Sequence, residues 1–155
     1  MRFLSFSAGN DEFGIPLEQV REVIGFPEFT SVPNSPHHFL GIMSLRDEVV
    51  PVIDLRIKLK IEPTLTEETA VVICDVNQSI FGLVVDIIHN VVAPADEYVT
   101  ALPELSQDQK ETFLLNAVRH NNQFILILDA GKLITASDQA LTDFKSSNIR
   151  SKVAA

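Results

Sequence analysis

Three aspartates occupy positions from which a side chain could do acid–base chemistry. Asp54, Asp86 and Asp129 each follow an apolar run that is typical of a strand, and paired carboxylates can serve as general acid and base. An aspartate just after a strand also commonly caps the next turn, because its side chain accepts hydrogen bonds from nearby backbone N–H groups. We favour the capping role. The alternative is a small metal- or carboxylate-dependent hydrolase that would use Asp54, Asp86 and a histidine.

The sequence lacks the patterns that accompany catalysis or cofactor binding. Its six glycines are scattered and form neither a G-x-G-x-x-G nor a Walker motif, and no G-x-S-x-G motif occurs. His37 and His38 are adjacent, and neighbouring loop residues usually point apart, so we expect two solvated histidines. Cys74 is the only cysteine, which rules out an intrachain disulfide, and its apolar neighbours predict a small buried residue. We therefore predict no catalytic residue, no cofactor and no metal site.

The composition is that of an acidic chain with enough apolar residues for a core. The 155 residues carry a formal net charge of -9, and 46% of them are hydrophobic. An acidic surface repels nucleic acid phosphates and anionic lipids. No apolar run reaches membrane-spanning length, and residues 3–7 alternate like a strand where a signal peptide would carry a charged and then an apolar stretch. We expect a cytoplasmic protein that neither binds nucleic acid nor inserts into a membrane.

A charged tip between two apolar runs predicts a β-hairpin. The runs cover residues 41–45 and 49–54, and they flank Arg46–Glu48, which suits two strands joined by a charged turn. Pro51 removes one ladder donor, so we expect the second strand at a sheet edge or at a bulge. Residues 54–59 then predict a short helix whose first residue lies near the N-cap.

An internal repeat indicates the architecture. Without a gap, residues 3–24 match residues 71–92, and further on residues 49–54 find an echo in residues 124–129. A repeat of this length is one small sheet unit, and about five short strands in each unit suit a small barrel. We therefore predict an all-β fold of two similar barrels packed together. The clearest matched pieces are Phe13-Gly14-Ile15 and Phe81-Gly82-Leu83.

The repeat also predicts one two-lobed domain over residues 1–145. Ser137 is the expected N-cap of a terminal helix that rests on the barrels, and the last residues are expected to fray. The expected boundaries are about 1–62 for lobe 1, 69–135 for lobe 2, 137–145 for the terminal helix and 146–155 for a flexible tail.

Two packed lobes leave a groove between them, and such grooves suit a helix or strand from a partner. The repeat puts residues 20–23 and residues 88–91 at equivalent positions in the two lobes, where they could face the groove. The apolar members of these segments suit the core equally well, and the sequence leaves both alternatives open.

Several motifs occur in a fixed order along nearly the whole chain. They are Phe13-Gly14-Ile15, Val20-x-Glu22-Val23, Val32-Pro33-Asn34-Ser35-Pro36, Phe39-Leu40-Gly41-Ile42-x-x-Leu45-Arg46, Val50-Pro51-Val52-Ile53-Asp54-Leu55-Arg56 and Gly82-Leu83-Val84-Val85-Asp86. In this order they resemble the CheW-type coupling proteins of bacterial chemotaxis. The resemblance implies two five-stranded SH3-like barrels. It also implies a non-catalytic adaptor that ties the cytoplasmic tips of methyl-accepting chemoreceptors to the histidine kinase CheA. A CheW-like module of a kinase pathway for pili or gliding is an alternative within the same class.

The matched segments and the resemblance together indicate which residues meet each partner. Glu22 is the acid expected within reach of Arg46, and a bidentate pair between them would fix the hairpin against the groove wall. Such an adaptor is recruited to receptor arrays at the inner face of the membrane. The expected receptor-binding residues are Val20, Glu22, Val23, Arg46, Ile88 and Val91, and those that would bind the regulatory domain of the kinase are Leu45, Pro103, Glu104 and Leu105.

The chain departs from the usual family pattern at two places. Asp47 stands where the family usually has the glycine of Asn-Leu-Arg-Gly, and aspartate reaches positive φ less easily than glycine but better than most residues. Leu105 stands where members often have the aromatic residue of Pro-x-Pro-Glu-Phe. Both departures bear on which receptor or kinase the chain serves.

Overall fold

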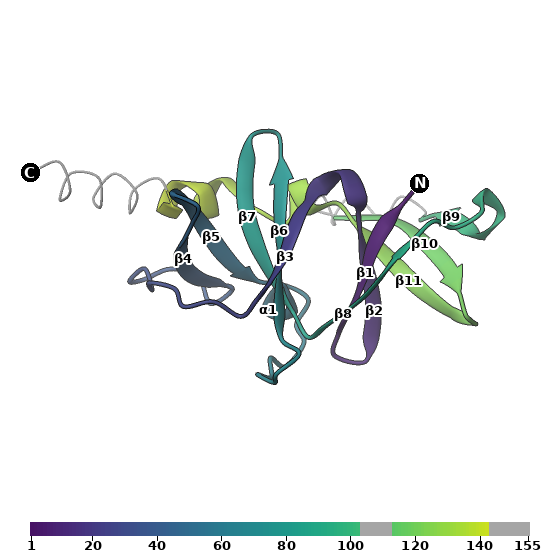
Figure 1. Ribbon diagram of the computed structural model, residues 1–155, viewed down its shortest axis with the longest axis horizontal. Helices are drawn as coiled ribbons and strands as arrows, with labels where there is room; N and C mark the ends of the chain where they lie inside the picture. The colour runs from purple at the N-terminus through teal and green to yellow at the C-terminus, as the bar shows by residue number, and fades with distance from the viewer. Residues whose placement is uncertain (103–112, 143–155) are drawn as a thin grey trace, which may run out of the picture.

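The protein is built almost entirely from short strands, which Figure 1 shows in chain order. The computed structural model describes residues 1–102 and 113–142. The elements are β1 (Phe3–Ala8), β2 (Asp11–Pro16), η1 (Leu17–Gln19), β3 (Val20–Gly25), β4 (Phe39–Leu45), β5 (Glu48–Asp54), α1 (Leu55–Lys58), β6 (Ala70–Val76), β7 (Ser79–Val85), β8 (Ile87–Val92), η2 (Asp96–Tyr98), β9 (Val99–Ala101), β10 (Leu114–His120), β11 (Gln123–Leu128) and η3 (Ala130–Lys132).

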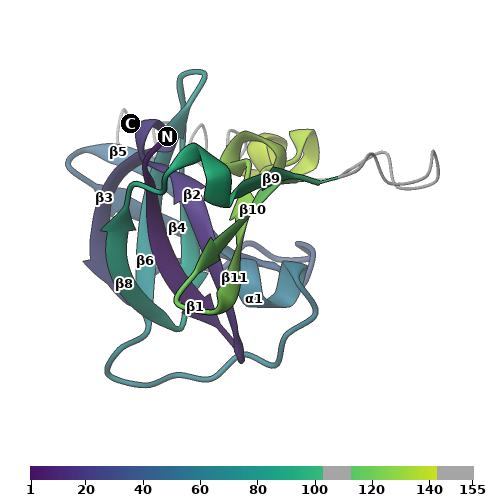
Figure 2. The same ribbon diagram turned by 90° about the vertical axis from the view of Figure 1, so that its right-hand side faces the viewer.

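These strands form two sheets. One sheet has six strands in the order β8-β1-β2-β11-β10-β9, and the other has five strands in the order β3-β6-β7-β5-β4. Each sheet curls into a small barrel, and the two barrels pack side by side (Figure 1); the six-stranded barrel faces the viewer in Figure 2. The predicted all-β fold of two packed barrels is confirmed. The sixth strand of the larger barrel is the short β9 at one end of the sheet order.

The barrels do not follow the two halves of the chain. The β1–β2 hairpin continues through η1 into β3, which joins the other sheet, and the β6–β7 hairpin continues into β8, which crosses back. The five-stranded barrel is therefore built from residues 20–85, and the β1–β2 hairpin completes the barrel of β8 to β11. The predicted lobes at about residues 1–62 and 69–135 are wrong, because the opening hairpin of each half completes the barrel made by the later strands of the other half.

The strand register supports the repeat itself. In the parallel pair of β2 and β11, Gly14 lies opposite Ile127. In the parallel pair of β5 and β7, Val52 lies opposite Gly82. The sequence repeat matches Gly14 to Gly82 and Val52 to Ile127. The β2–β11 pair is therefore equivalent to the β7–β5 pair, and each barrel contains one parallel strand pair with the same register.

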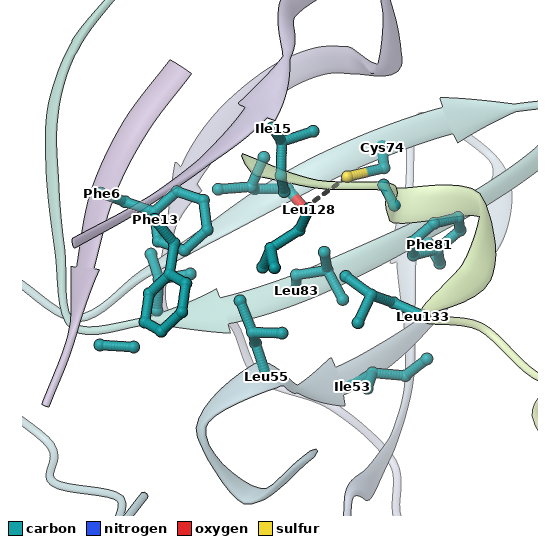
Figure 3. Packing of buried hydrophobic residues seen from close by; sticks show 14 of the residues in the cluster. Phe6, Phe13, Ile15, Ile53, Leu55, Cys74, Phe81, Leu83, Leu128 and Leu133 are labelled. Carbon is teal, nitrogen blue, oxygen red and sulfur yellow. Dashed lines mark hydrogen bonds between the residues drawn. The ribbon is translucent and has the colours of Figure 1, made fainter. Parts of the chain in front are cut away.

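Buried side chains form one cluster inside each barrel and a larger cluster between the barrels. Figure 3 shows residues of the larger cluster. Along β6, Val71 and Ile73 belong to the core of the five-stranded barrel, whereas Val72 and Cys74 belong to the core between the barrels. Burial on both faces explains why such strands are continuously apolar and do not alternate. Desolvation also raises the pKa of the Cys74 thiol far above its ordinary value, which suits an inert core residue.

The core between the barrels contains matched residues from both barrels. Phe13 and Phe81 are matched by the sequence repeat, and both are buried in this cluster (Figure 3). Each barrel therefore packs an equivalent face against the other. Further matched pairs in the same cluster are Ile15 with Leu83, Phe6 with Cys74 and Leu128 with Ile53.

The β4–β5 hairpin turns through two residues, as its charged tip predicted. Arg46 has a φ of 49° and Asp47 a φ of 67°, the left-handed pair that a type I′ turn requires. The turns at residues 77–78 and 121–122 also have two positive φ values each. Asp47 thus adopts a positive φ, a conformation that glycine reaches more easily.

Pro51 does not mark a sheet edge, so the predicted edge position of β5 is wrong. β5 lies between β7 and β4, and the irregularity in the hairpin register lies on β4 and not at the proline. Ile42, opposite Pro51, exchanges both of its backbone hydrogen bonds with Thr30 and so needs none from the proline. On the other side, the pairing with β7 begins at Val52. The backbone N–H that Pro51 lacks is therefore not needed, because Pro51 lies one residue before the β5–β7 ladder begins.

The terminal helix begins earlier than predicted, and residues 136–142 are helical. Thr135 Oγ1 accepts a hydrogen bond of 3.1 Å from the backbone N–H of Asp138. Asp138 Oδ2 accepts one of 3.0 Å from the backbone N–H of Thr135, which completes a reciprocal capping box. The N-cap is thus Thr135 and not Ser137. The end of the predicted helix and the predicted tail lie outside the described residues.

Gly14→Ala should destabilise the fold. A Cβ built at Gly14 would lie 2.5 Å from Cδ2 of Phe3 and 2.9 Å from Cδ1 of Ile127, and both neighbours belong to the core of the six-stranded barrel. Overpacking at such a site costs about 1–3 kcal/mol in the free energy of unfolding, which urea denaturation measures.

Gly25→Ala is the matched control, because nothing lies within 4 Å of a Cβ built there. This change should be neutral or stabilise the protein by about 0.4–1 kcal/mol through the unfolded state. Equal stability of the two variants would contradict the close packing of Phe3 over Gly14.

Candidate functional site

Two ion pairs join the tip of the β4–β5 hairpin to β3. Arg46 donates from Nη1 to Glu22 Oε1 at 2.5 Å and from Nη2 to Glu22 Oε2 at 3.0 Å, so the predicted bidentate pair is present. Arg21 donates to Glu48 at 3.1 Å. Because β3 and β4 lie at opposite ends of the sheet order, these pairs span the seam at which the five-stranded barrel closes.

The Arg46 pair lies at the surface and orients the hairpin more than it stabilises the fold. The Arg46 side chain is 67% exposed and that of Glu22 is 21% exposed. Solvent screens a pair of this kind, and its worth is about 0–1 kcal/mol. The planar fork of arginine nevertheless fixes the direction of the carboxylate that it binds.

A shallow groove of about 380 Å³ runs between the two barrels. Val23, Ile24 and Gly25 of β3 line one side, Ile87 and Ile88 of β8 line the other, and residues 67–70 complete it. β3 and β8 each end a sheet order, and they lie next to each other between the barrels (Figure 1). The structure thus brings Val23 and Ile88 to one groove, whereas their counterparts in the repeat, Val91 and Val20, are not among its lining residues.

The other residues expected at the partner surfaces are spread over the molecule. Val20 is half-buried and packs against the core between the barrels. Leu45 is half-buried against the core of the five-stranded barrel. Val91 is 54% exposed and lines a different hollow, at the other end of β8. Pro103, Glu104 and Leu105 lie outside the described residues.

Asp54 and Asp86 share a single buried guanidinium. Arg56 donates from Nε and Nη2 to the two carboxylate oxygens of Asp54, each at 3.0 Å, and from Nη1 to Asp86 Oδ1 at 2.9 Å. Asp54 also accepts from the backbone N–H of Arg56 at the N-cap of α1. Asp86 Oδ2 accepts from the backbone N–H of Gly9 at 2.7 Å. Gly9 belongs to the six-stranded barrel and Arg56 to α1 beside the other, so this network ties the barrels together.

The electrostatics of this network are those of a structural ion cluster. Burial acts to lower the pKa of Arg56, but the hydrogen bonds and charges of Asp54 and Asp86 outweigh it and raise that pKa. Asp129 caps η3 and accepts from the side chain of Gln19 at 3.0 Å. Asp54 and Asp129 therefore cap the turns that follow them, as the capping interpretation predicted. Asp86 does not cap the next turn; it binds Arg56 and the backbone N–H of Gly9.

His38 corrects the expectation of two solvated loop histidines. Its Nε2 lies 2.9 Å from Oδ1 of Asp138, a carboxylate that is fully buried, and Lys58 Nζ lies 3.8 Å from the other oxygen. The terminal helix is thereby anchored beside α1. His37 is exposed, as predicted. No sequence motif links residues a hundred positions apart, so the sequence carried no signal for this contact.

Within residues 1–102 and 113–142, no group of three or more histidine, cysteine, aspartate or glutamate side chains could hold a metal ion. In the same part of the chain, no helix is long and apolar enough to cross a membrane.

Comparison with known proteins decides the family. Residues 2–138 match the family model of the CheW-like domain. The chain belongs to the CheW-like domain family. This CheW-like domain is 30% identical to chemotaxis protein CheW of Klebsiella aerogenes, over 91% of this chain and 86% of that protein. It is 29% identical to protein FrzA of Myxococcus xanthus, over 88% of this chain and 87% of that protein.

A solved structure supports the fold of this CheW-like domain. The scaffolding protein TtCheW from Thermoanaerobacter tengcongensis superposes with a TM-score of 0.78 at 22% identity, over 88% of this chain and 94% of that one. The resemblance inferred from the ordered motifs is therefore confirmed at the level of family and fold.

Arg56→Ala should cost about 3–5 kcal/mol in the free energy of unfolding, because it leaves the buried carboxylate of Asp54 without its partner. Arg46→Ala, which removes the exposed pair, should cost only about 0–1 kcal/mol. Urea denaturation of both variants measures the difference. Two equally small losses would mean that the Arg56 network contributes no more than a surface pair.

Proposed function

We propose that this chain is a non-catalytic adaptor that couples the cytoplasmic tips of chemoreceptors to the histidine kinase CheA. It would work in the cytoplasm, in receptor arrays at the inner face of the membrane. Family membership supports the proposal, as do the names of its relatives as chemotaxis proteins.

The observation that carries the proposal is the groove between the edge strands of the two barrels. Apolar side chains of β3 and β8 line it, together with Glu67 and Glu68. A receptor tip is an antiparallel helical hairpin, and one helix of such a hairpin can lay apolar side chains into a groove of this kind. Val23 lines the groove and is 40% exposed. An apolar side chain that is exposed in this way is suited to contact with another protein. Glu22, one residue away on β3, is held by Arg46. The pair would hold the hairpin tip and the groove wall in one orientation.

The kinase would bind a second surface, made by Leu45, which is next to Arg46, and by residues 103–105. Leu45 precedes the hairpin turn, and residues 103–105 follow β9 in sequence. We keep Leu45, Pro103, Glu104 and Leu105 as the proposed kinase contacts, on the family resemblance. Two partner surfaces on one rigid pair of barrels are what an adaptor needs.

The hydrolase alternative loses the residues on which it depended. Both oxygens of Asp54 bind Arg56, and Asp86 binds Arg56 and Gly9. Carboxylates engaged in this way are poor bases, because proton transfer would break the ion cluster. His38, the histidine that is paired with a carboxylate, binds Asp138. It does not bind Asp54 or Asp86.

A CheW-like module in another kinase pathway is the second candidate. Protein FrzA, a relative with a name other than CheW, matches at 29% identity over most of both chains, so relatives of this chain are not confined to proteins named CheW. The adaptor mechanism would be unchanged and only the partners would differ. Capture of partners from extracts of the producing organism, with identification of the kinase that is retained, separates the two candidates.

Arg46→Ala should leave the barrels folded and impair receptor-dependent control of the kinase. The physical reason is that the hairpin tip loses its fixed orientation, while an exposed pair contributes only about 0–1 kcal/mol to folding. Arg46→Lys should restore control incompletely, because lysine lacks the planar fork. The measurement is kinase activity with purified receptor, kinase and variant, beside thermal unfolding of each variant.

Arg2→Ala is the control for loss of one exposed positive charge, since Arg2 lies outside the groove and the seam. If Arg46→Ala controls the kinase as the wild type does, the pair has no role in coupling. If both variants fail equally, the effect comes from net charge alone.

Val23→Asp should weaken binding to the receptor tip by about 1 kcal/mol or more, roughly a factor of five or more in Kd, because a charge would enter an apolar contact. Val23 is a better probe than Val20, whose packing against the core between the barrels would mix binding with stability. Phe124→Asp is the control, an exposed apolar residue on β11 that is 62% exposed. Unchanged receptor affinity of a folded Val23→Asp would refute the groove as the receptor site.

A further inference from the structure

A second hollow, of about 1030 Å³, opens at the far end of β8 from the groove between the barrels. Residues 90–95 line it from the end of β8 and the loop that follows. Tyr98 of η2 and residues 119–122 of the β10–β11 turn complete it. It shares no lining residue with the groove proposed for the receptor. It is wide and open to solvent, which suits a segment of a protein more than an enclosed small molecule.

The charge of this hollow is unlike that of the rest of the chain. The chain has a net charge of -9, yet no aspartate or glutamate is among the lining residues. Asp96 and Glu97 precede Tyr98 on η2 but do not line the hollow. Arg119 is exposed on its wall. The lining of the hollow therefore carries one positive charge, that of Arg119, on an acidic protein.

In residues 1–102 and 113–142, three donor side chains around this hollow have no partner. Among the described residues, none forms a hydrogen bond or ion pair with the side chains of Arg119, His120 or Tyr98, in contrast to Arg21, Arg46 and Arg56. Asn90, Asn121 and Asn122 line the same space. The residues around this hollow thus include a guanidinium, a phenol and three amides, all of which can donate hydrogen bonds.

Apolar surface lies beside these donors. Val91 is 54% exposed and Tyr98 is 48% exposed, and both line the hollow. Tyrosine and arginine are the residue types enriched where proteins bind one another. Val91, expected from the repeat at the receptor groove, lies here instead.

We propose that this hollow docks an acidic segment of a protein partner, with a carboxylate on Arg119 and a neighbouring apolar side chain against Val91 and Tyr98. A carboxylate matches the fork of one guanidinium. A phosphate group carries a charge of about −1.5 to −2, which one arginine would leave partly uncompensated. The surface is additional to the receptor groove, and the inference does not rest on the adaptor function.

The test is a titration of the isotope-labelled full chain with a blocked hexapeptide of alternating glutamate and valine, followed by NMR. Shift changes should concentrate at residues 90–95, 98 and 119–122. Binding should weaken as salt rises, because the contact is charge-assisted. Arg119→Gln should raise the Kd by about ten-fold, the size expected when one charge-assisted pair is lost. Thermal unfolding should be unchanged, because Arg119 is exposed.

Matched probes and variants make the result decisive. Arg2→Gln removes the same charge elsewhere on the surface and should leave the Kd within about two-fold, which is the expected scale for a distant screened charge. The hexapeptide with glutamine in place of glutamate should not bind. Equal losses in the two variants, or shifts spread over the surface, would overturn the proposal. So would tighter binding of a phosphoserine peptide or of inorganic phosphate, and so would concentration-dependent shifts at the hollow without peptide, which would assign it to a second copy of this chain.

Discussion

The apolar core between the two barrels is the constraint on which the rest of the structure depends. Each barrel is completed by a hairpin from the other half of the chain, so neither half can close its sheet alone. The chain must therefore cross between the barrels twice, once into β3 and once into β8. Both crossings leave an edge strand beside the interface, and the groove between the barrels exists because these two edges meet there.

The interface is held by polar contacts as well as by apolar packing. Arg56 binds Asp86, whose other oxygen accepts from Gly9 of the opposite barrel. A guanidinium buried among two carboxylates needs each of its partners, because an unpaired buried charge is costly. The network therefore defines one relative position of the barrels. That rigidity suits a protein proposed to hold two partners in a fixed geometry, since movement at one surface then displaces the other.

Edge strands provide the surfaces for recognition while the central strands provide stability. β6 and β7 lie inside the five-stranded sheet and bury both faces. β3 keeps exposed side chains on one face, and β8 is exposed over the consecutive residues 89–91. An unpaired edge invites association with other chains. At the seam of the five-stranded barrel, this edge is covered by the ion pairs of Arg21 and Arg46, which leaves the apolar part of β3 open at the groove.

The sequence alone determined the all-β class, the internal repeat, the β4–β5 hairpin and the pairing of Arg46 with Glu22. The strand class and the hairpin rest on local periodicity and on residue types within a short span, which a linear pattern can carry. The pair of Arg46 and Glu22, which are 24 positions apart, was reached through the repeat and the family resemblance. The sequence also determined the capping role of Asp54, because the cap lies two residues from the N–H that it accepts.

Only the tertiary structure decided which hairpin completes which barrel. The repeat made the two halves equivalent, and equivalent hairpins can close either barrel with the same local contacts. The choice is made by the apolar faces that become buried between the barrels, where Phe13 and Phe81 take matching places. The same long-range packing places His38 beside Asp138 and buries Arg56 between two aspartates. It also places Val91 and Val23 in two different hollows. These contacts join residues far apart in the chain, so their energy depends on the assembled fold and leaves no periodic pattern in the sequence.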